Sequence, residues 1–429
     1  MSTDVSDERS GVPEDPFAAK DQLFGVGLMR DPHPRLHELM ESGPVHHGSM
    51  SGQFDMIGPD NLIYPEDDQV SVVGFWPVDE GFRDPERFSN SWYEPSLGNV
   101  IGRTILQMDP PEHYRFRLLL QGAFSKKEMQ RWEREFVRDI VRSYLLPLVP
   151  RGRADLATDF AFHYPITVTA VAAGLPVSDV PAFYRQAALL TNVSVPEATR
   201  LDAARELGEL VQRLIDERRA EPKGDLIGLL VQAELKQTGG EGKKKLTDEE
   251  IVAFLRLLVP AGAQTTYRSL TNILFGLLSH PDQLAAVQAD RSLIPRAIEE
   301  GLRWEAPLLS FGRTCTRDTT IADQPIAAGT HVNLCVHAAN HDPSRWDHPD
   351  EFDIFRPELG HMSFGQGNHI CLGIHFARME LRVALEEILD ELPNLRLDPD
   401  ATDVHITGLG SRTAIHLPCV WDVPAGEGG

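Results

Sequence analysis

The most informative stretch of the sequence is HMSFGQGNHICLGIHFAR, residues 361–378. Its glycines Gly365, Gly367 and Gly373 permit positive φ values and let a flat ligand approach the backbone. We therefore expect a tight loop that leads into a helix starting near Cys371. The dipole and the free N–H groups of a helix N-terminus stabilise a thiolate, so Cys371 is predicted to be a metal-binding sulfur.

The residues alone leave two other interpretations of Cys371 open. A single cysteine is most often a small buried side chain, here in a turn. A structural zinc site would need three further ligands, and His369 is the only nearby candidate in the sequence.

The spacing around Cys371 distinguishes between these interpretations. The pattern F-x-x-G-x-H-x-C-x-G runs from Phe364 to Gly373, and its chance frequency in a chain of this composition is roughly 4 in 10⁵. It resembles the heme-binding loop of the cytochrome P450 family. The resemblance implies that Cys371 is the axial thiolate ligand of the iron in heme b, and that Phe364, Gly365, His369 and Gly373 contribute to the heme site.

The resemblance covers about residues 30–420 and implies the cytochrome P450 fold, mainly α with minor β. The apolar spacing agrees with this fold class: helices dominate after Pro110, and short strands with turn residues follow near Arg313. We expect a disordered leader at residues 1–20 and a single large helical domain with a small β-sheet region at 21–429.

Composition excludes several classes of function. The chain has 429 residues, with 41 Lys and Arg against 64 Asp and Glu, so its formal net charge is −23. This charge argues against a nucleic-acid partner. Four cysteines without a C-x-x-C pair favour a reducing compartment, which predicts a cytoplasmic protein. The sequence shows neither a signal peptide nor a stretch long enough for a membrane span.

Local patterns predict further elements. Residues 32–43 have helical spacing, residues 48–69 are rich in turn residues and predict loops or an extended hairpin, and residues 91–102 predict a loop. Residues 70–76 predict a strand, and Pro77 predicts the start of a short helix. Thr247 begins a capping pattern for a long helix that extends to His280.

Glu300 and Arg303 stand three residues apart on one expected helix, and in isolation they would be a solvated pair. Their place before the Cys371 loop resembles the E-x-x-R motif of the family, whose third partner would be Arg356. The resemblance implies a buried ion network that orders the segment before the loop.

His113 and Arg117 lie four residues apart after Pro110 and Pro111, and alone they would suit a solvent-facing helix. The segment resembles the helix that reaches the heme propionates. His113 and Arg117 would then neutralise those carboxylates together with Arg313 and His369.

The apolar helix carries Ala261, Gly262, Gln264 and Thr265, and small residues in such a helix most often indicate close helix packing. The segment resembles the oxygen-binding groove of the family, in which an acid and a threonine relay protons. Thr265 matches, whereas Gln264 replaces the acid and can only hold a water. Either Gln264 is native and water performs the relay, or it is an introduced change that slows oxygen activation or favours peroxide.

The resemblance also implies an apolar substrate pocket and an electron donor. The expected lining residues are Leu97, Val100, Ile101, Leu258, Ala261, Ala263, Thr265, Leu308, Leu309, Phe311 and Leu409, a set that plain core packing would also explain. A ferredoxin or flavodoxin would carry electrons from NAD(P)H to a basic cluster, which we expect at Lys126, Lys127, Arg131, Arg378 and Arg382. One departure from the family pattern is His341 in AANHDP, where arginine is common.

These observations predict a monomeric heme-thiolate monooxygenase that uses O₂ to hydroxylate, epoxidise or dealkylate a largely apolar small molecule. One alternative is a peroxide-dependent heme-thiolate oxidase, which Gln264 would suit. Another, of a different class, is a non-catalytic heme-thiolate protein that senses a small ligand; the threonine at 265 speaks against it.

Overall fold

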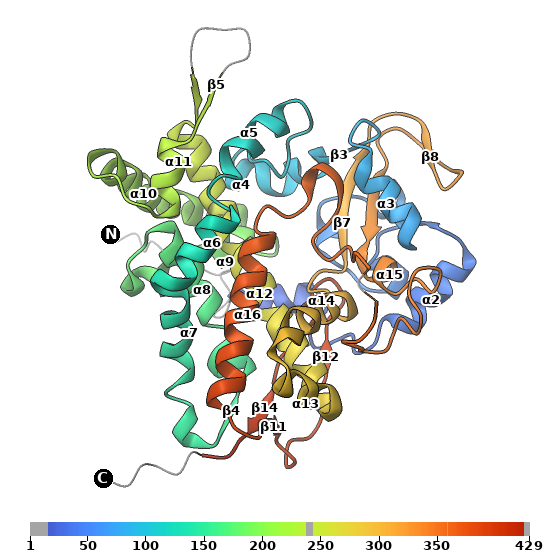
Figure 1. The fold of residues 1–429 in the computed structure, drawn as a ribbon. Coiled ribbons are helices and arrows are strands. Elements are labelled where there is room, and N and C mark those ends of the chain that lie inside the picture. Colours follow the sequence, from blue (N-terminus) through green and yellow to red (C-terminus); the bar gives the residue numbers. More distant parts are fainter. Residues whose placement is uncertain (1–15, 237–242, 358, 424–429) are drawn as a thin grey trace, which may run out of the picture.

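The helices gather on one side of the molecule and the main sheet on the other (Figure 1). This structure, a computed structural model, describes residues 16–236, 243–357 and 359–423. The helices of the larger, helical side are α5 (Glu112–Leu120), α6 (Lys126–Trp132), α7 (Arg138–Leu145), α8 (Tyr164–Ala173), α9 (Val180–Thr191), α10 (Glu197–Ala220), α11 (Leu226–Gln232), α12 (Asp248–Ser279), α13 (Pro281–Ala289), α14 (Ile294–Trp304) and α16 (Ile374–Glu391). The prediction of a mainly α chain with minor β structure is confirmed.

Helix α12 runs through the helical side and begins where the capping pattern predicts. The Thr247 hydroxyl accepts a hydrogen bond from the backbone N–H of Glu250, and the Glu250 carboxylate accepts one from the N–H of Thr247. This reciprocal capping satisfies two donors that would otherwise lack partners. Although α12 is long, none of the described helices is apolar enough over a sufficient length to cross a membrane.

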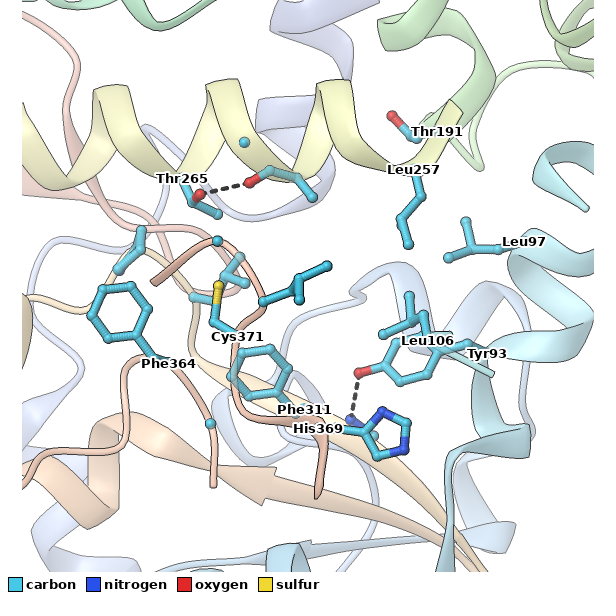
Figure 2. Close-up of a pocket in the computed structure, with 18 of the residues that line it drawn as sticks. Tyr93, Leu97, Leu106, Thr191, Leu257, Thr265, Phe311, Phe364, His369 and Cys371 are labelled. Carbon is cyan, nitrogen blue, oxygen red and sulfur yellow. Dashed lines mark hydrogen bonds between the residues drawn. The ribbon is translucent and has the colours of Figure 1, made fainter. Parts of the chain in front are cut away.

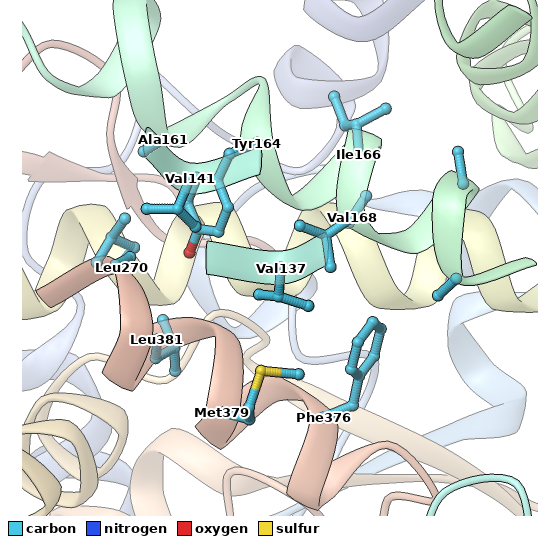
Figure 3. Close-up of a cluster of buried hydrophobic side chains, with 14 of the residues drawn as sticks. Val137, Val141, Ala161, Tyr164, Ile166, Val168, Leu270, Phe376, Met379 and Leu381 are labelled. Carbon is cyan, nitrogen blue, oxygen red and sulfur yellow. The ribbon is translucent and has the colours of Figure 1, made fainter. Parts of the chain in front are cut away.

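A buried apolar cluster joins α7, α8, α12 and α16 (Figure 3). Val141, Val168, Leu270 and Leu381 contribute one side chain from each helix, and none is more than 1% exposed. Burying such a side chain stabilises the fold by ~1.5–3 kcal/mol. The core therefore holds α12 and α16, the two helices that flank the candidate site, in a defined arrangement.

The main sheet has five strands, in the order β1-β2-β10-β7-β3. Its strands are β1 (Val45–His47), β2 (Gln69–Val72), β10 (His331–Cys335), β7 (Ser310–Cys315) and β3 (Phe88–Ser89). Val332 of β10 pairs with Val70 in parallel and with Arg313 of β7 in antiparallel register. Helices α2 (His33–Ser42), α3 (Phe75–Arg83) and α15 (Val336–Asn340) lie around this sheet (Figure 1).

The remaining strands are short. A three-stranded sheet contains β11 (Arg396–Leu397), β14 (Pro418–Val420) and β4 (Arg153–Asp155). Three antiparallel pairs are β12 (Ile406–Thr407) with β13 (Thr413–Ala414), β5 (Glu234–Lys236) with β6 (Lys243–Lys245), and β8 (Thr319–Ile321) with β9 (Gln324–Ile326).

The predicted E-x-x-R network is confirmed. Arg303 donates from Nε and Nη2 to the two carboxylate oxygens of Glu300, each at 2.8 Å, and both side chains are buried. Arg356 contacts the same carboxylate at 3.4 Å. Glu300 also accepts from the backbone N–H of Asp353 at 3.0 Å, so one buried carboxylate ties α14 to the segment that precedes the Cys371 loop.

Two local predictions were wrong. The expected loop at residues 91–102 consists of helical turns: a 3₁₀ turn at Asn90–Tyr93, a π-helical turn at Glu94–Gly98 and α4 (Asn99–Ile101). The expected strand at residues 70–76 ends at Val72, because Gly74 turns the chain at φ = 86° and Asp342 accepts from the N–H of Phe75 at the start of α3.

The segment at residues 48–69 forms three 3₁₀ turns rather than a hairpin, at Gly52–Phe54, Pro59–Leu62 and Glu66–Asp68. The Glu66 carboxylate organises them, because it accepts from the backbone N–H of Ser49 and from the Asn61 amide. A side-chain acceptor thus replaces the strand pairing that a hairpin would use.

The prediction of a disordered leader at residues 1–20 is wrong for the last five of these residues. Helix α1 (Pro16–Leu23) includes them, and residues 1–15 lie outside the described part of the chain. Two side chains of α1 attach it to the helical core. Asp21 pairs with Arg268 of α12, and Lys20 is buried against α9 and α12. Long-range contacts of this kind leave no signal in the local composition.

Candidate functional site

A cavity of about 500 Å³ lies between α12 and the loop that precedes α16. Thr265 projects from α12 toward Cys371 and Phe364 on the opposite wall (Figure 2). Ten of the twelve candidate site residues line it: Arg117, Ala261, Gly262, Thr265, Arg313, Phe364, Gly365, His369, Cys371 and Gly373. Residues far apart in the sequence are therefore brought to one cavity, while His113 and Gln264 lie outside its lining.

The Cys371 loop is tight, and two of its glycines stand where a larger residue would not fit sterically. Gly365 and Gly367 both adopt φ = 68°, in the left-handed region that side chains with a Cβ avoid. A Cβ at Gly367 would lie 2.5 Å from the carbonyl oxygen of Phe82. The backbone N–H of Cys371 donates to the carbonyl of Phe364 at 2.9 Å, which closes the loop and presents the sulfur to the cavity.

Helix α16 begins slightly later than predicted. Its first residue is Ile374 and its N-cap is Gly373, so Cys371 stands before the helix rather than in its first turn. Burial raises the pKa of the Cys371 thiol, whereas the backbone N–H of Gly373, Arg117 and Arg378 act to lower it. A bound cation would oppose the effect of burial, because a thiol that coordinates a metal is deprotonated.

Four basic residues, Arg117, Arg313, His113 and His369, lie close together at or beside the cavity. Arg313 is buried on β7, Arg117 is partly buried on α5, and no described carboxylate forms an ion pair with either guanidinium. The rings of His113 and His369 lie 4.0 Å apart, centroid to centroid. Both ring nitrogens of His113 and Nε2 of His369 are buried and lack a hydrogen-bond partner among the described residues.

Burial is also the main cause of the pKa shifts of these four basic residues. Burial, together with the positive charge of nearby groups that include Arg117, lowers the pKa of His113 to about 4 and that of His369 to about 2. It lowers the pKa of Arg117 and of Arg313 as well. Buried cations without an ion pair and imidazole nitrogens without a hydrogen bond destabilise the folded state. This group of basic residues is therefore suited to binding an anionic ligand.

These residues fit the heme that the Cys371 motif implies. The Cys371 thiol and two glycines of its loop, Gly365 and Gly373, line one wall of the cavity, and small residues of α12 line the other. Two arginines, Arg117 and Arg313, lie at the edge, where they could pair with carboxylates. His113 is the exception to the predicted arrangement, because it reaches the cavity only by packing against His369.

The α12 groove is formed by Ala261, Gly262 and Thr265. The Thr265 hydroxyl donates to the carbonyl oxygen of Ala261 at 2.7 Å, and this bond is drawn in Figure 2. A Cβ at Gly262 would lie 3.2 Å from Oγ1 of Thr169, so this glycine also permits close packing of α12 on α8. The small residues of α12 therefore serve two purposes: they allow close packing on α8, and they leave room for a ligand in the cavity.

Gln264 does not face the cavity, which corrects the prediction that it acts beside Thr265. Its Oε1 accepts a hydrogen bond from Nζ of Lys20 at 3.0 Å, and Lys20 also donates to Thr191 at 3.0 Å. Successive residues of an α-helix are rotated by about 100° from one another, so Thr265 points into the cavity and Gln264 points toward α1 and α9. Burial lowers the pKa of Lys20 to about 7.

The substrate-pocket prediction is correct in part. Leu97, Leu258, Ala261, Thr265, Leu308 and Phe311 line the cavity, whereas Val100, Ile101, Ala263, Leu309 and Leu409 are buried elsewhere in the core. Sequence reasoning missed the lining residues Lys20, Leu23, Phe24, Asp60, Ile63, Tyr93, Leu106, Thr191 and Leu257. Several come from the expected leader and from residues 48–69, where local sequence carries no sign of the contact.

The predicted basic cluster is mostly neutralised. Arg131 pairs with Glu128 and Glu135, Arg378 with Glu299, and Arg382 with Glu133 and Glu386. Lys126 and Lys127 are exposed and have no acidic partner among the residues the structure describes. The basic surface is thus reduced to two lysines at the start of α6.

Comparison with known proteins agrees with the fold and the cavity. The family model described as "Cytochrome P450" matches residues 177–405. The chain is 33% identical to the cytochrome P450 monooxygenase PikC of Streptomyces venezuelae over 384 residues, which cover 87% of each chain.

Solved structures show the same architecture. Cytochrome P450 CYP109Q5 from Chondromyces apiculatus superimposes with a TM-score of 0.80 at 28% identity, covering 94% of this chain and 98% of the other. CYP109E1 from Bacillus megaterium in complex with testosterone has a TM-score of 0.76 at 27% identity, covering 92% and 100%. Since a family model matches more than half of the chain and a relative is one-third identical over most of its length, the chain belongs to the cytochrome P450 family of heme-thiolate monooxygenases.

Proposed function

We propose that the chain binds heme b through Cys371 and uses O₂ to insert one oxygen atom into a largely apolar small organic molecule, by hydroxylation, epoxidation or dealkylation. The observation that carries this proposal is the placement of the Thr265 hydroxyl and the Cys371 sulfur on opposite walls of one cavity (Figure 2). This arrangement leaves space between the expected iron ligand and a hydroxyl that can supply a proton.

The residues around the cavity have separate tasks in this proposal. Heme supplies the redox chemistry that activates O₂ when it is bound. Arg117, Arg313 and His369 would hold its propionates by charge and hydrogen bonds, and His113 packs against the ring of His369. Thr265 can exchange its bond to Ala261 for one directed into the cavity, which would place a proton donor there.

The substrate class follows from the character of the walls. Leu97, Leu257, Leu258, Leu308 and Phe311 present apolar side chains to the cavity. A pocket of this kind favours ligands that bury apolar surface. The similar protein CYP109E1 has been solved with testosterone, a mainly apolar molecule, which supports the same class here.

For electron delivery, the proposal includes a ferredoxin or flavodoxin that carries electrons from NAD(P)H. The exposed Lys126 and Lys127 stand at the start of α6, and α6 packs against α16, the helix that follows Cys371. Their charge would attract an acidic donor to an otherwise acidic protein. A cytoplasmic, monomeric enzyme is part of the proposal; all four cysteines are free, as a reducing compartment requires.

Charge reversal at Lys127 tests the docking surface. Lys127→Glu should lower the rate of electron transfer from an acidic donor roughly 3- to 10-fold at low ionic strength, because steering by opposite charge is lost. The difference should shrink at high salt, where charges are screened. Arg317→Glu makes the same charge change at an exposed site between β7 and β8 and should leave the rate unaltered. Equal effects of both variants would contradict docking at α6.

A peroxide-driven reaction is the second candidate, because the α12 residue next to Thr265 brings no acid into the cavity. The residue beside Thr265 cannot titrate, and its amide is held by Lys20. Turnover with hydrogen peroxide alone, at a rate close to that with NAD(P)H and a donor protein, would support this route. The monooxygenase relatives favour an enzyme over a ligand sensor.

Two variants of α12 test the proposed function itself. Thr265→Ala should lower the product formed per reductant consumed by ~10-fold and release hydrogen peroxide, because a positioned proton donor is lost. Gln264→Glu should leave this ratio nearly unchanged, because the new carboxylate would pair with Lys20 on the side of α12 that faces α1 and α9. The measurement is product, reductant and peroxide in one reaction. Full coupling in Thr265→Ala would remove Thr265 from the mechanism.

A further inference from the structure

A cluster of three histidines lies outside the heme cavity, between α2 and α15. His33 is the first residue of α2, and His337 and His341 stand one helical turn apart on α15 and at its C-cap. One ligand nitrogen from each of the three rings lies within 4.8 Å of the other two. His337 and His341 are fully buried, and the His33 side chain is 12% exposed. None of the three lines the cavity described above.

Each ring uses one nitrogen for a contact that orients it. His337 Nε2 lies 2.7 Å from the carbonyl oxygen of Ala306, and His341 Nδ1 lies 2.9 Å from that of His337. His33 Nε2 lies 3.3 Å from a carboxylate oxygen of Glu305. A carbonyl can only accept, so the proton of His337 is on Nε2 and that of His341 is on Nδ1. This pattern fixes both tautomers.

The second nitrogen of each ring has no partner. His33 Nδ1, His337 Nδ1 and His341 Nε2 are all shielded from solvent, and none has a hydrogen-bond partner among the described residues. The tautomers of His337 and His341 leave a lone pair on each of these atoms. A buried polar atom without a partner destabilises the fold, so three such atoms on three adjacent rings indicate a shared ligand.

The chemistry of the cluster selects a metal cation over a water molecule. A water can donate to only two of three lone pairs, whereas a cation can accept all three. Imidazole is a preferred ligand of zinc, copper and nickel, and ligating histidines almost always donate their other N–H to a carboxylate or a backbone carbonyl. The contacts to Glu305, Ala306 and His337 supply such acceptors.

We propose that His33, His337 and His341 form a binding site for a zinc-type transition-metal ion, separate from the heme. Zinc–nitrogen bonds of ~2.0–2.1 Å place tetrahedral ligand atoms roughly 3.3 Å apart, so the rings close around the ion when it binds. The fourth position is open to water. The neighbouring cations Arg303 and Arg412 are each paired with a glutamate, which limits their repulsion of the ion.

The ion would join three parts of the fold. His33 anchors α2, His337 and His341 anchor α15, and Ala306 is hydrogen-bonded to His337 and adjoins Pro307 and Leu308 in the cavity wall. The role we assign to the site is therefore to hold the N-terminal region and one wall of the cavity in place. The proposed metal site does not depend on which substrate or electron donor the enzyme uses.

The test uses tag-free, heme-loaded protein that has been treated with a chelator and then dialysed against zinc chloride. Metal analysis should find one zinc ion per chain in addition to iron, and zinc should raise Tm by a few degrees through its preference for the folded state. Wild-type protein that takes up no zinc would overturn the proposal whatever the variants do.

Two variants and a control locate the ion. His341→Gln should weaken zinc binding at least ~10-fold, and His33→Gln, at the more exposed edge of the cluster, should do the same with little risk to folding. His348→Gln removes a histidine whose side chain is 80% exposed and should bind zinc as the wild type does. The heme absorption spectrum reports folding of each variant. Unchanged zinc affinity in folded His33→Gln would place the ion elsewhere.

Discussion

Replacement of Cys371 by serine is expected to abolish the red-shifted Soret band of the reduced, CO-bound protein and to lower monooxygenase turnover at least ~100-fold. A serine hydroxyl does not ionise in this environment and cannot donate electron density as a thiolate does. No other cysteine can take its place, because Cys315, Cys335 and Cys419 are buried away from the cavity. The difference spectrum of the reduced protein with and without CO is the measurement.

The matched control is Cys335→Ser. Cys335 is fully buried at the end of β10, and its sulfur accepts from the N–H of Ala338 at 3.5 Å, a contact that a hydroxyl can replace. This variant should keep the Soret band. A band that persists in folded, heme-loaded Cys371→Ser, or disappears in folded Cys335→Ser, would sink the assignment of Cys371.

Glu300→Gln is expected to lower the free energy of unfolding by about 3–5 kcal/mol, because it leaves a buried guanidinium without its counter-charge. Arg303 is 2% exposed and cannot reach solvent, since it also donates to the carbonyls of Asn340, Pro349 and Glu351. Urea unfolding followed by circular dichroism measures the loss. Weaker retention of heme should accompany it, because the network orders the segment before Cys371.

An exposed ion pair provides the comparison for Glu300. Glu209 pairs with Arg205 at 2.9 Å on the surface of α10, and both side chains are 57% exposed. Solvent-exposed pairs contribute little, so Glu209→Gln should cost less than about 1 kcal/mol. Similar losses in the two variants would show that burial of the Glu300 network has no energetic consequence.

Local sequence predicted the elements that depend on local interactions. Thr247 and Glu250 cap α12 because donor and acceptor are three residues apart. The Cys371 loop followed from glycines whose backbone angles other residues avoid. The same approach failed for residues 91–102, where helical turns form without a periodic apolar pattern. For residues 48–69 it left loops and a hairpin open, and the Glu66 carboxylate orders the turns that form instead of a hairpin.

Contacts between distant segments account for the errors at the site. Gln264 was expected beside Thr265 at the reaction centre, but Lys20 of the supposed leader holds it on the other face of α12. Two arginines of the expected basic cluster, Arg378 and Arg382, pair with Glu299 and Glu133, which lie far away in the chain. Each of these partners is selected by packing of whole helices rather than by neighbouring residues.

The sequence by itself determined the family, the expected iron ligand and the order of the main helices, because these depend on residue types at short, fixed spacings. The tertiary structure decided which side chains share a space: Thr265 with Cys371, Lys20 with Gln264, and His33 with the two histidines of α15. The physical reason is that a side chain's surroundings in a packed core come from segments far away in the chain, and their relative placement exists only once the whole core has formed.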